Sequence, residues 1–334
     1  MPNILITTRC NKKCVYCFAK EKVDIGYKST NVVDKEISLE NLDIIISFLK
    51  KSNCRKFALI GGEPTLHSKF KEIINRLYAH DFMIHLFSNA TWKASYNKFF
   101  ESIELNRLTF LLNINPPEYT DANEWNIINN NLKALEGRDR VTLGLNIFEP
   151  EFKYRYLIDL ARKYKFKFIR WSLTNPIIGK KGNHFVPLKD APLYSDRIVK
   201  FSDECAKNNI ETASDCSIPL CMFSERQIGR LMLNKTLNLL NNICIGGPID
   251  IGPDLNIWKC FAFSELNNLR LTDFDNLMQI HTYYRRAFDK YIKELLPTDK
   301  CYNCRLLKNN LCAGGCMAHT VIKHGLKLEE EAII

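Results

Sequence analysis

Short apolar runs alternate, through the first half of the chain, with longer segments in which apolar residues recur every three or four positions. The short runs predict β-strands at residues 3–7, 56–60, 82–88, 107–114, 140–148 and 166–174. The longer segments predict amphipathic helices at residues 38–50, 69–80, 95–104, 124–137, 152–164 and 192–207. Ser38 stands at the N-cap position of the first helix, and Gly137 stands where the fourth would end.

Strands and helices that alternate in this way build a parallel sheet with right-handed crossovers. We therefore predict an α/β fold for the first half of the chain. In such sheets and barrels the functional residues gather at the carboxyl ends of the strands.

The alternation stops near residue 175, where a connection rich in proline, glycine and lysine begins. Eight cysteines follow residue 210: Cys216, Cys221, Cys244, Cys260, Cys301, Cys304, Cys312 and Cys316. A chain of 334 residues is long for one simple domain. We therefore expect a core in residues 1–185, a helical linking region in residues 186–240 and a cysteine-rich domain in residues 241–334.

The composition fits a soluble globular protein, with 46% hydrophobic and 25% charged residues. No apolar stretch is long enough for a membrane span, and the start of the chain lacks the features of a secretory signal. We therefore expect a cytoplasmic protein without a membrane partner. In a reducing compartment, clustered cysteines indicate metal or catalytic sites rather than disulfides. Cys54 and Cys205 stand apart from the clusters, and we interpret them as core thiols.

The net charge is +10, which would attract acidic peptides, phosphates or nucleic acid. The densest basic stretch, residues 153–170, has the pattern of a helix with exposed lysines and arginines followed by a strand. It carries no nucleic-acid-binding signature. We interpret most of the charge as a solvated surface.

Three cysteines, Cys10, Cys14 and Cys17, follow the first predicted strand with C-x3-C-x2-C spacing. Three thiolates can hold three irons of a [4Fe–4S] cluster and leave the fourth iron open to another ligand. Two alternatives stay open on spacing alone. One is a zinc site whose fourth ligand comes from His67, His80 or His85, and the other is a purely structural role.

The stretch FALIGGEPTLH, residues 57–67, runs from the second predicted strand into Gly61, Gly62, Glu63 and Pro64. Two adjacent glycines let a backbone come close to a ligand, and a carboxylate beside them can bind an amino group. An ordinary turn between a strand and a loop is the alternative interpretation.

Together these two elements resemble the radical S-adenosylmethionine (SAM) enzymes over about residues 3–175. The cysteines match the C-x3-C-x-aromatic-C motif of that family, and residues 61–64 match its GGEP motif. LFSNAT, residues 86–91, matches the polar end of the third strand. Asn113 and Asn115 stand where the family usually has a serine and an aspartate. The SAM-binding residues that the resemblance implies are Tyr16, Gly61, Gly62, Glu63, Pro64, Ser88, Asn89, Asn113 and Asn146.

The resemblance implies a partial (β/α)6 TIM-like barrel. It also implies that SAM chelates the open iron through its amino and carboxylate groups. An electron from the cluster, supplied by a reductant such as flavodoxin or ferredoxin, would then cleave SAM into methionine and a 5′-deoxyadenosyl radical. That radical takes a hydrogen atom from the substrate, while the protein positions the cofactor and excludes competing reactions.

A second cysteine set has C-x2-C-x7-C-x3-C spacing through Cys301, Cys304, Cys312 and Cys316, and Cys244 and Cys260 precede it. Spacing alone allows iron–sulfur or zinc ligation. After a radical SAM core, the CAGGC end at residues 312–316 resembles a SPASM-type auxiliary-cluster domain.

This second resemblance shows departures. Leu255 replaces a usual glycine, seven residues rather than five separate Cys304 from Cys312, and no cysteine follows Cys316. One or two auxiliary [4Fe–4S] clusters are therefore implied. A second cluster would have an open iron or would borrow Cys216 or Cys221.

The leading hypothesis is a radical SAM oxidoreductase that oxidises or crosslinks a peptide or protein side chain. Because the cysteine triplet begins at residue 10, we expect any leader-peptide-binding domain to be a separate protein. A radical SAM enzyme that acts on a sugar, alcohol or nucleoside is the alternative. A non-enzymatic zinc or iron–sulfur binding protein is a more remote one.

Overall fold

A computed structural model describes residues 1–25, 36–104, 106–237, 248–266 and 268–325. Within them, ten strands form one sheet in the order β12-β11-β10-β1-β4-β5-β6-β7-β8-β9. All neighbours from β10 to β9 are parallel, and β11 and β12 are antiparallel additions at one edge. The parallel strands are β1 (Asn3–Leu5), β4 (Lys56–Ile60), β5 (Met83–Ser88), β6 (Leu108–Asn113), β7 (Val141–Ile147), β8 (Phe168–Leu173), β9 (Glu211–Ser214) and β10 (Asp250–Ile251).

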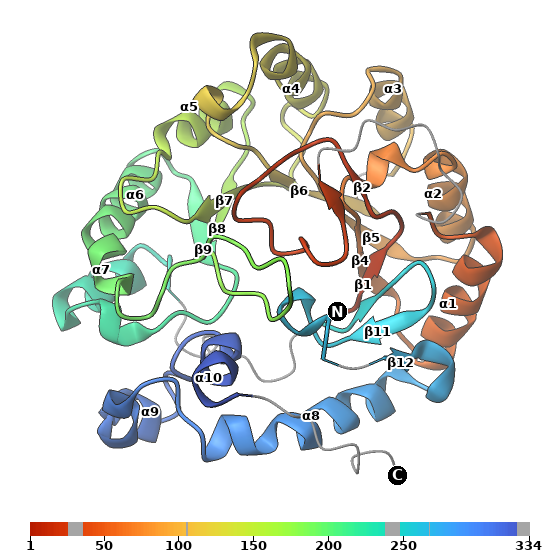
Figure 1. The fold of residues 1–334 in the computed structure, drawn as a ribbon. Helices are drawn as coiled ribbons and strands as arrows, with labels where there is room; N and C mark the ends of the chain where they lie inside the picture. The colour runs from red at the N-terminus through yellow and green to blue at the C-terminus, as the bar shows by residue number, and fades with distance from the viewer. Residues whose placement is uncertain (26–35, 105, 238–247, 267, 326–334) are drawn as a thin grey trace.

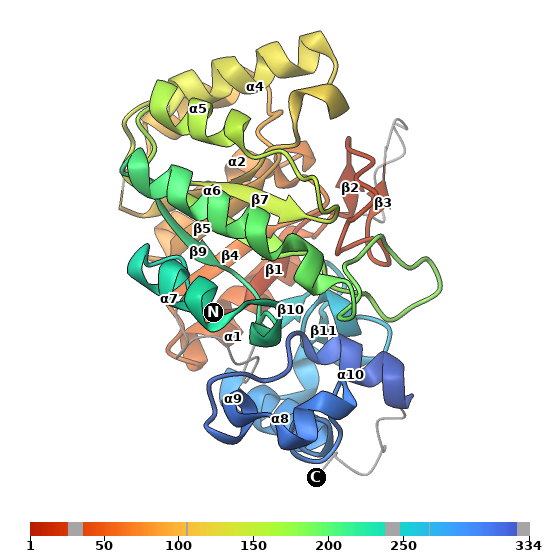
Figure 2. The ribbon, with the colours of Figure 1, turned by 90° about the vertical axis from the view of Figure 1, so that its left-hand side faces the viewer.

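Helices surround the curved sheet in Figure 1. They are α1 (Leu39–Lys51), α2 (Phe70–Ala79), α3 (Ser95–Glu101), α4 (Ala122–Ala134), α5 (Arg155–Lys163), α6 (Ser195–Lys207) and α7 (Glu225–Leu233). A layer below them contains α8 (Leu277–Lys293), α9 (Arg305–Lys308) and α10 (Met317–His324), as Figure 2 shows. The sheet stays open, since β9 and β12 are its two ends, and the predicted partial TIM-like barrel is confirmed.

All six predicted strands are present, with ends that differ by at most a few residues from the predicted ones. Ser38 caps α1 as predicted, and its hydroxyl accepts a hydrogen bond from the backbone N–H of Asn41 (3.0 Å). The helix predicted at 124–137 begins two residues earlier and ends at Ala134, and Gly137 follows in a left-handed conformation. Gly137 therefore belongs to the turn after the helix rather than to its last turn.

The strands missed by the sequence analysis are β9, β10, β11 (Asn256–Trp258) and β12 (Leu269–Arg270). Each has only two to four residues, too few to show an apolar period. Since β10 pairs with β1, the chain after residue 241 completes the sheet of the core. The boundaries 1–185, 186–240 and 241–334 stay a prediction.

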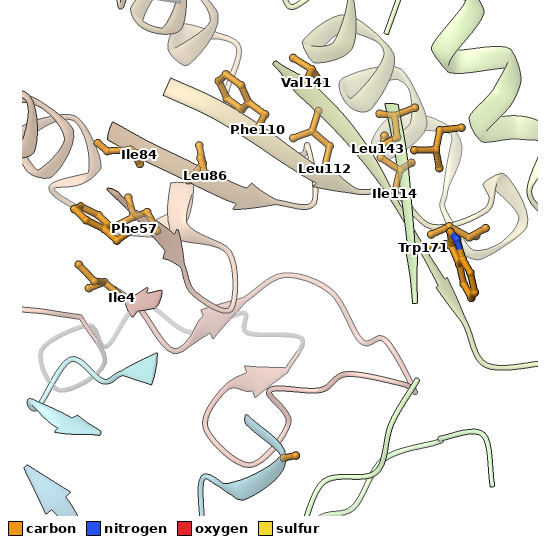
Figure 3. Close-up of a cluster of buried hydrophobic side chains, with 14 of the residues drawn as sticks. Ile4, Phe57, Ile84, Leu86, Phe110, Leu112, Ile114, Val141, Leu143 and Trp171 are labelled. Atoms are coloured by element: carbon orange, nitrogen blue, oxygen red, sulfur yellow. The ribbon is translucent and has the colours of Figure 1, made fainter. Parts of the chain in front are cut away.

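The main hydrophobic core lies between the sheet and the surrounding helices. Ile4, Phe57, Leu86, Phe110 and Leu143 come from five neighbouring strands, and all are fully buried in this layer (Figure 3). Because side chains alternate between the two faces of a strand, their sequence neighbours point into the interior of the partial barrel.

The interior face combines a small apolar cluster with polar groups. The cluster contains Leu5, Ala58, Ile60 and Trp258. Farther along the sheet, the His85 ring nitrogen Nδ1 lies 2.6 Å from Thr109 Oγ1. The partial barrel is therefore packed at one side and polar at the other. No helix in the described part of the chain combines the length and apolar character needed to cross a bilayer.

Asp250 joins the C-terminal part of the chain to the first strand. It is 1% exposed, and its carboxylate accepts hydrogen bonds from Asn3 Nδ2 (2.6 Å) and Trp258 Nε1 (3.0 Å). Burial raises the pKa of Asp250 from 3.8 to about 8, although these donors oppose the increase. The Asp250 carboxyl group therefore stays protonated in the native state over a pH range in which it is ionised in the unfolded chain.

We predict that raising the pH from 5 to 8 destabilises the protein relative to Asp250→Asn. Between the two pKa values the unfolded state binds fewer protons, so stability falls as the pH rises, by on the order of 1 kcal/mol per pH unit. Above pH 8 the dependence should vanish. Thermal unfolding of both proteins across this range measures it, and a constant difference between them would show that Asp250 is ionised in the native protein.

Candidate functional site

The cysteine loop, residues 9–25, crosses the carboxyl-terminal edge of the parallel sheet. It begins and ends with two short parallel strands, β2 (Arg9–Cys10) and β3 (Asp24–Ile25). In Figure 2 these strands lie on the side toward which the arrow of β7 points. The predicted iron ligands Cys10, Cys14 and Cys17 are all half-buried in this loop. The loop therefore stands where parallel α/β folds place their chemistry.

Each of the three thiols has a nearby N–H donor. The backbone N–H of Lys12 faces Cys10, that of Ala19 faces Cys17, and Asn115 Nδ2 donates to Cys14 Sγ (3.4 Å). Donors of this kind stabilise thiolates and tune iron–sulfur clusters. The donor set therefore fits a cluster bound through Cys10, Cys14 and Cys17.

Without a cation, the loop disfavours thiolates. Burial raises the pKa of Cys10 to about 12 and that of Cys17 to about 11, and the charge of Cys14 raises both further. Among the described residues, no three Cys, His, Asp or Glu side chains stand at metal-ligand spacing. The three sulfurs therefore lie in one loop, close enough for their charges to affect one another, but not at the spacing of bound metal ligands.

The histidines weighed as a fourth zinc ligand have other contacts. The two ring nitrogens of His67 lie 3.1 Å from the carbonyl oxygen of Ile37 and 3.0 Å from the backbone nitrogen of Lys69. His80 lies against Lys50, and His85 lies against Thr109. These contacts favour the iron–sulfur interpretation over the zinc site.

Gly61 and Gly62 bring the end of β4 directly against the cysteine loop. The backbone N–H of Gly62 donates to the carbonyl oxygen of Thr7 (2.9 Å), and that of Glu63 donates to the carbonyl oxygen of Arg9 (2.7 Å). A side chain at residue 62 would place its Cβ 2.3 Å from the Arg9 oxygen and 2.7 Å from Cys10 Cβ. Only glycine fits here, which gives the second motif a physical reason within this chain.

Glu63 is 1% exposed and braces the ends of two neighbouring strands. Its carboxylate accepts hydrogen bonds from Ser88 Oγ (2.8 Å), the backbone N–H of Asn89 (2.8 Å) and Thr65 Oγ1 (2.6 Å). Burial raises its pKa while these donors lower it. Pro64 follows as the first residue of a short 3-10 turn, Pro64–Leu66. Contact between Glu63 and SAM stays a prediction, and the structure adds this bracing role.

Asn89 links the end of β5 to the cysteine loop. Its Nδ2 donates to Asn11 Oδ1 (2.9 Å), and Asn11 Nδ2 donates to Thr91 Oγ1 (2.9 Å). Ser88 lies behind this pair, where its hydroxyl accepts from the backbone N–H of Ala90 (3.1 Å). The loop is thus attached to the end of β5, and contact of Ser88 and Asn89 with SAM stays a prediction. Asn11 was missed because no pattern marks it.

Asn115 connects the fourth parallel strand of the core to the cysteine triplet. Besides donating to Cys14, it accepts a hydrogen bond from the Tyr16 hydroxyl through Oδ1. The Tyr16 ring stacks on Phe148 with centroids 5.0 Å apart, and Tyr156 lines the same small cavity. Tyr16 and Asn115 therefore form one unit with the predicted cluster ligands.

Asn113 and Asn146 lie one strand apart on the interior face. Asn146 Nδ2 lies 3.5 Å from Asn113 Oδ1, and Ser172 Oγ lies 3.4 Å from Asn146 Oδ1. Gly144 makes room for Asn113, since a Cβ there would stand 2.2 Å from Asn113 Oδ1. The two asparagines thus form a polar row beside Tyr16, and their contact with SAM stays a prediction.

Residues 181–184, in the connection that begins near residue 175, cover part of the cysteine loop. Asn183 Nδ2 donates to the carbonyl oxygen of Tyr16 (3.3 Å). The backbone N–H of His184 donates to the carbonyl oxygen of Val15 (3.0 Å). Glu21 in turn accepts from the backbone N–H of Lys181 (2.6 Å). The proline and glycine content of this connection predicts a loop, but nothing in the sequence predicts that it contacts the cysteine loop.

Four of the C-terminal cysteines are neighbours. Burial raises the pKa of the Cys221 and Cys312 thiols, and the nearby charges of Cys301 and Cys304 raise both further. Cys216 lies instead beside Asp215, with 3.8 Å between Sγ and Oδ2.

The other predicted auxiliary ligands are Cys260, which is half-buried, Cys316, which is buried, and Cys244, which lies outside the described residues. Of the two predicted core thiols, Cys205 is buried and Cys54 is half-buried against the core.

Comparisons of sequence agree with the motifs. The family model of the radical SAM superfamily matches residues 4–175. A GTP 3′,8-cyclase of Limosilactobacillus fermentum is 27% identical over 135 residues, and one of Brucella abortus is 22% identical over 151. These matches cover 40% and 43% of this chain, and 39% and 42% of the relatives' own lengths. The chain thus spans well under half of the curated relatives it matches.

Comparisons of structure cover almost the whole chain. SuiB from Streptococcus suis bound to its precursor peptide SuiA has a TM-score of 0.66 at 14% identity, over 99% of this chain and 75% of that one. The structure titled native anSMEcpe with bound AdoMet has a TM-score of 0.65 at 18% identity, over 100% of this chain and 94% of that one. At these identities the likeness concerns the fold.

We predict that Asn115→Leu makes the reduction potential of the cluster at Cys10, Cys14 and Cys17 more negative. Leucine keeps the volume but removes the N–H donor to Cys14, and hydrogen bonds to cluster sulfurs raise the potential. Asn129→Leu is the matched control, since it makes the same substitution at an asparagine whose side chain contacts Trp125 and Tyr164. Redox titration followed by electron paramagnetic resonance (EPR) measures both, and equal potentials in Asn115→Leu and wild type would remove Asn115 from this role.

Proposed function

Because the chain belongs to the radical SAM superfamily, whose members are enzymes that use a [4Fe–4S] cluster and SAM, we propose that it modifies a side chain of a peptide or protein substrate. The modification we propose is an oxidation or crosslink that begins with removal of a hydrogen atom. The reaction takes place at the carboxyl-terminal edge of the sheet, where the cysteine loop lies.

The residues of this edge have distinct roles in the proposal. Cys10, Cys14 and Cys17 hold the cluster, which together with bound SAM supplies a 5′-deoxyadenosyl radical. Gly62 has no side chain, which lets the backbone lie directly beside Cys10. Glu63 offers its carboxylate to the SAM amino group while it fixes the end of β5.

The remaining site residues orient the loop and limit access to it. Asn11 and Asn115 hold the cysteine loop from two different strands. Tyr16 and Phe148 form an aromatic wall, and Asn183 and His184 cover the loop between Cys14 and Cys17. Such a cover excludes water from a radical reaction, which protects the intermediate from side reactions.

One observation carries the choice of a peptide substrate. The likeness to SuiB and anSMEcpe extends over 99–100% of this chain and so includes the cysteine-rich C-terminal part, and one of the SuiB structures is bound to a precursor peptide. A substrate of this kind also suits the net charge of +10, which attracts acidic peptides.

A second candidate is a nucleotide substrate. It is supported by the sequence relatives named GTP 3′,8-cyclase, whose similarity is confined to 40–43% of this chain. We rank it second because that similarity covers less than half of the chain, whereas the likeness to SuiB and anSMEcpe covers almost all of it.

We predict that Cys10→Ala, Cys14→Ala and Cys17→Ala each abolish the cleavage of SAM, because each removes one of only three iron ligands. Chromatography of 5′-deoxyadenosine after anaerobic reduction measures this. Cys54→Ala is the control, since Cys54 stands apart from the other cysteines in the sequence and its thiol donates to the carbonyl oxygen of Lys56. Cleavage of SAM by all three loop variants would overturn the mechanism.

We predict that peptides encoded beside the gene of this protein increase 5′-deoxyadenosine formation and lose about two mass units, whereas GTP does neither. Deuterium moves from a labelled side chain into 5′-deoxyadenosine if that side chain is the hydrogen donor. The Cys10→Ala protein is the negative control. Deuterium transfer from labelled GTP, with none from any peptide, would favour the nucleotide candidate.

A further inference from the structure

The C-terminal thiols of Cys301, Cys304 and Cys312 come from two turns that touch. Cys301 lies in the 3-10 turn Asp299–Asn303, and the backbone N–H of Cys304 donates to the carbonyl oxygen of Cys301 (3.1 Å). This tight turn keeps the backbones of the C-x2-C pair close together. Cys312 begins the second turn, where the backbone N–H of Gly314 donates to its sulfur (3.2 Å).

Gly314 sets the contact between these turns. A Cβ at this position would stand 2.5 Å from Pro297 Cγ and 3.7 Å from Cys301 Sγ, and the residue has a φ of +78°. Both facts exclude a larger residue. Gly314 therefore lies between the sulfurs of Cys301 and Cys312, and Cys304 follows directly after the turn that holds Cys301.

The segment that contains Cys221 packs directly on the second turn. The Cys312 sulfur lies 4.0 Å from the carbonyl oxygen of Ile218, and a Cβ at Gly315 would stand 3.3 Å from Pro219 Cδ. Leu220 and Ile218 are fully buried and anchor the segment, whereas Cys221 is exposed. The anchored backbone thus presents the Cys221 thiol at the edge of the C-terminal turns.

Cys216, the alternative to Cys221 as a borrowed ligand, faces a different neighbour. It stands two residues after β9, and its sulfur lies 3.8 Å from Asp215 Oδ2, which also pairs with Arg170. Cys216 and Cys221 are only five positions apart, so the fold rather than the spacing distinguishes them.

We propose that Cys221 is the fourth ligand of an auxiliary [4Fe–4S] cluster held by Cys301, Cys304 and Cys312. It replaces the final cysteine that the chain lacks after Cys316. With four thiolates, every iron of this cluster has a protein ligand, so the cluster has no open position for a substrate. Its role is then electron transfer, and the assignment does not depend on which substrate the enzyme modifies.

The first test compares Cys221→Ala with Cys216→Ala in the full-length protein, reconstituted with iron and sulfide without oxygen. We expect Cys221→Ala to lose about four irons per chain, because one cube is no longer held, and Cys216→Ala to keep the wild-type content. Full iron content in Cys221→Ala, or an equal loss in both variants, overturns the assignment. SAM cleavage should persist in both, which separates this result from a failure of the proposed function.

A second test uses the wild-type holoprotein and therefore does not depend on how a variant folds. Iodoacetamide labelling followed by mass spectrometry reports the reactivity of each thiol. We expect Cys221 to be protected until a chelator removes the iron and to be labelled at least tenfold faster afterwards. Labelling of Cys221 at the same rate before and after chelation overturns the proposal.

Discussion

The backbone contact between Gly62 and Arg9 determines where the cysteine loop can lie. At this point two chain segments approach until no Cβ fits between them, and both Thr7 and Arg9 accept hydrogen bonds from the glycine turn. The same turn ends in Glu63, whose carboxylate fixes the start of the chain after β5. Asn89 then returns to Asn11 in the loop. Three consecutive strand ends are therefore linked in a closed set of contacts around the predicted cluster ligands.

Much of this arrangement could be predicted from sequence, for definite physical reasons. The long strands are continuous apolar runs because both faces of a covered parallel sheet are buried, and the cysteine spacing and the adjacent glycines are local signals. The partners of Asn115, Asn183 and Cys221 could not be predicted. The hydrogen bonds of Asn115 and Asn183 join residues 101 and 167 positions apart, and the neighbours of Cys221 lie near the other end of the chain, so all depend on the completed fold.

The two-residue strands β10 and β12 illustrate the same limit. Their sequences are too short to carry a period, and they exist because a neighbouring strand is already in place. The pairing of β10 with β1 buries the carboxyl group of Asp250. This group accepts hydrogen bonds from Asn3 and Trp258, which belong to different parts of the chain.

The pairing of β1 with β10 also has a consequence for biosynthesis. Strand β1 leaves the ribosome first, but its neighbour on one side, Asp250–Ile251, is made almost 250 residues later. Until then β1 presents an unpaired edge, which is a template for aggregation. Because the cysteine loop follows β1 directly, the nascent chain exposes three reactive thiols beside that edge. Early binding of iron to the thiols, or of a chaperone to this part of the chain, would protect the thiols and the unpaired edge during synthesis.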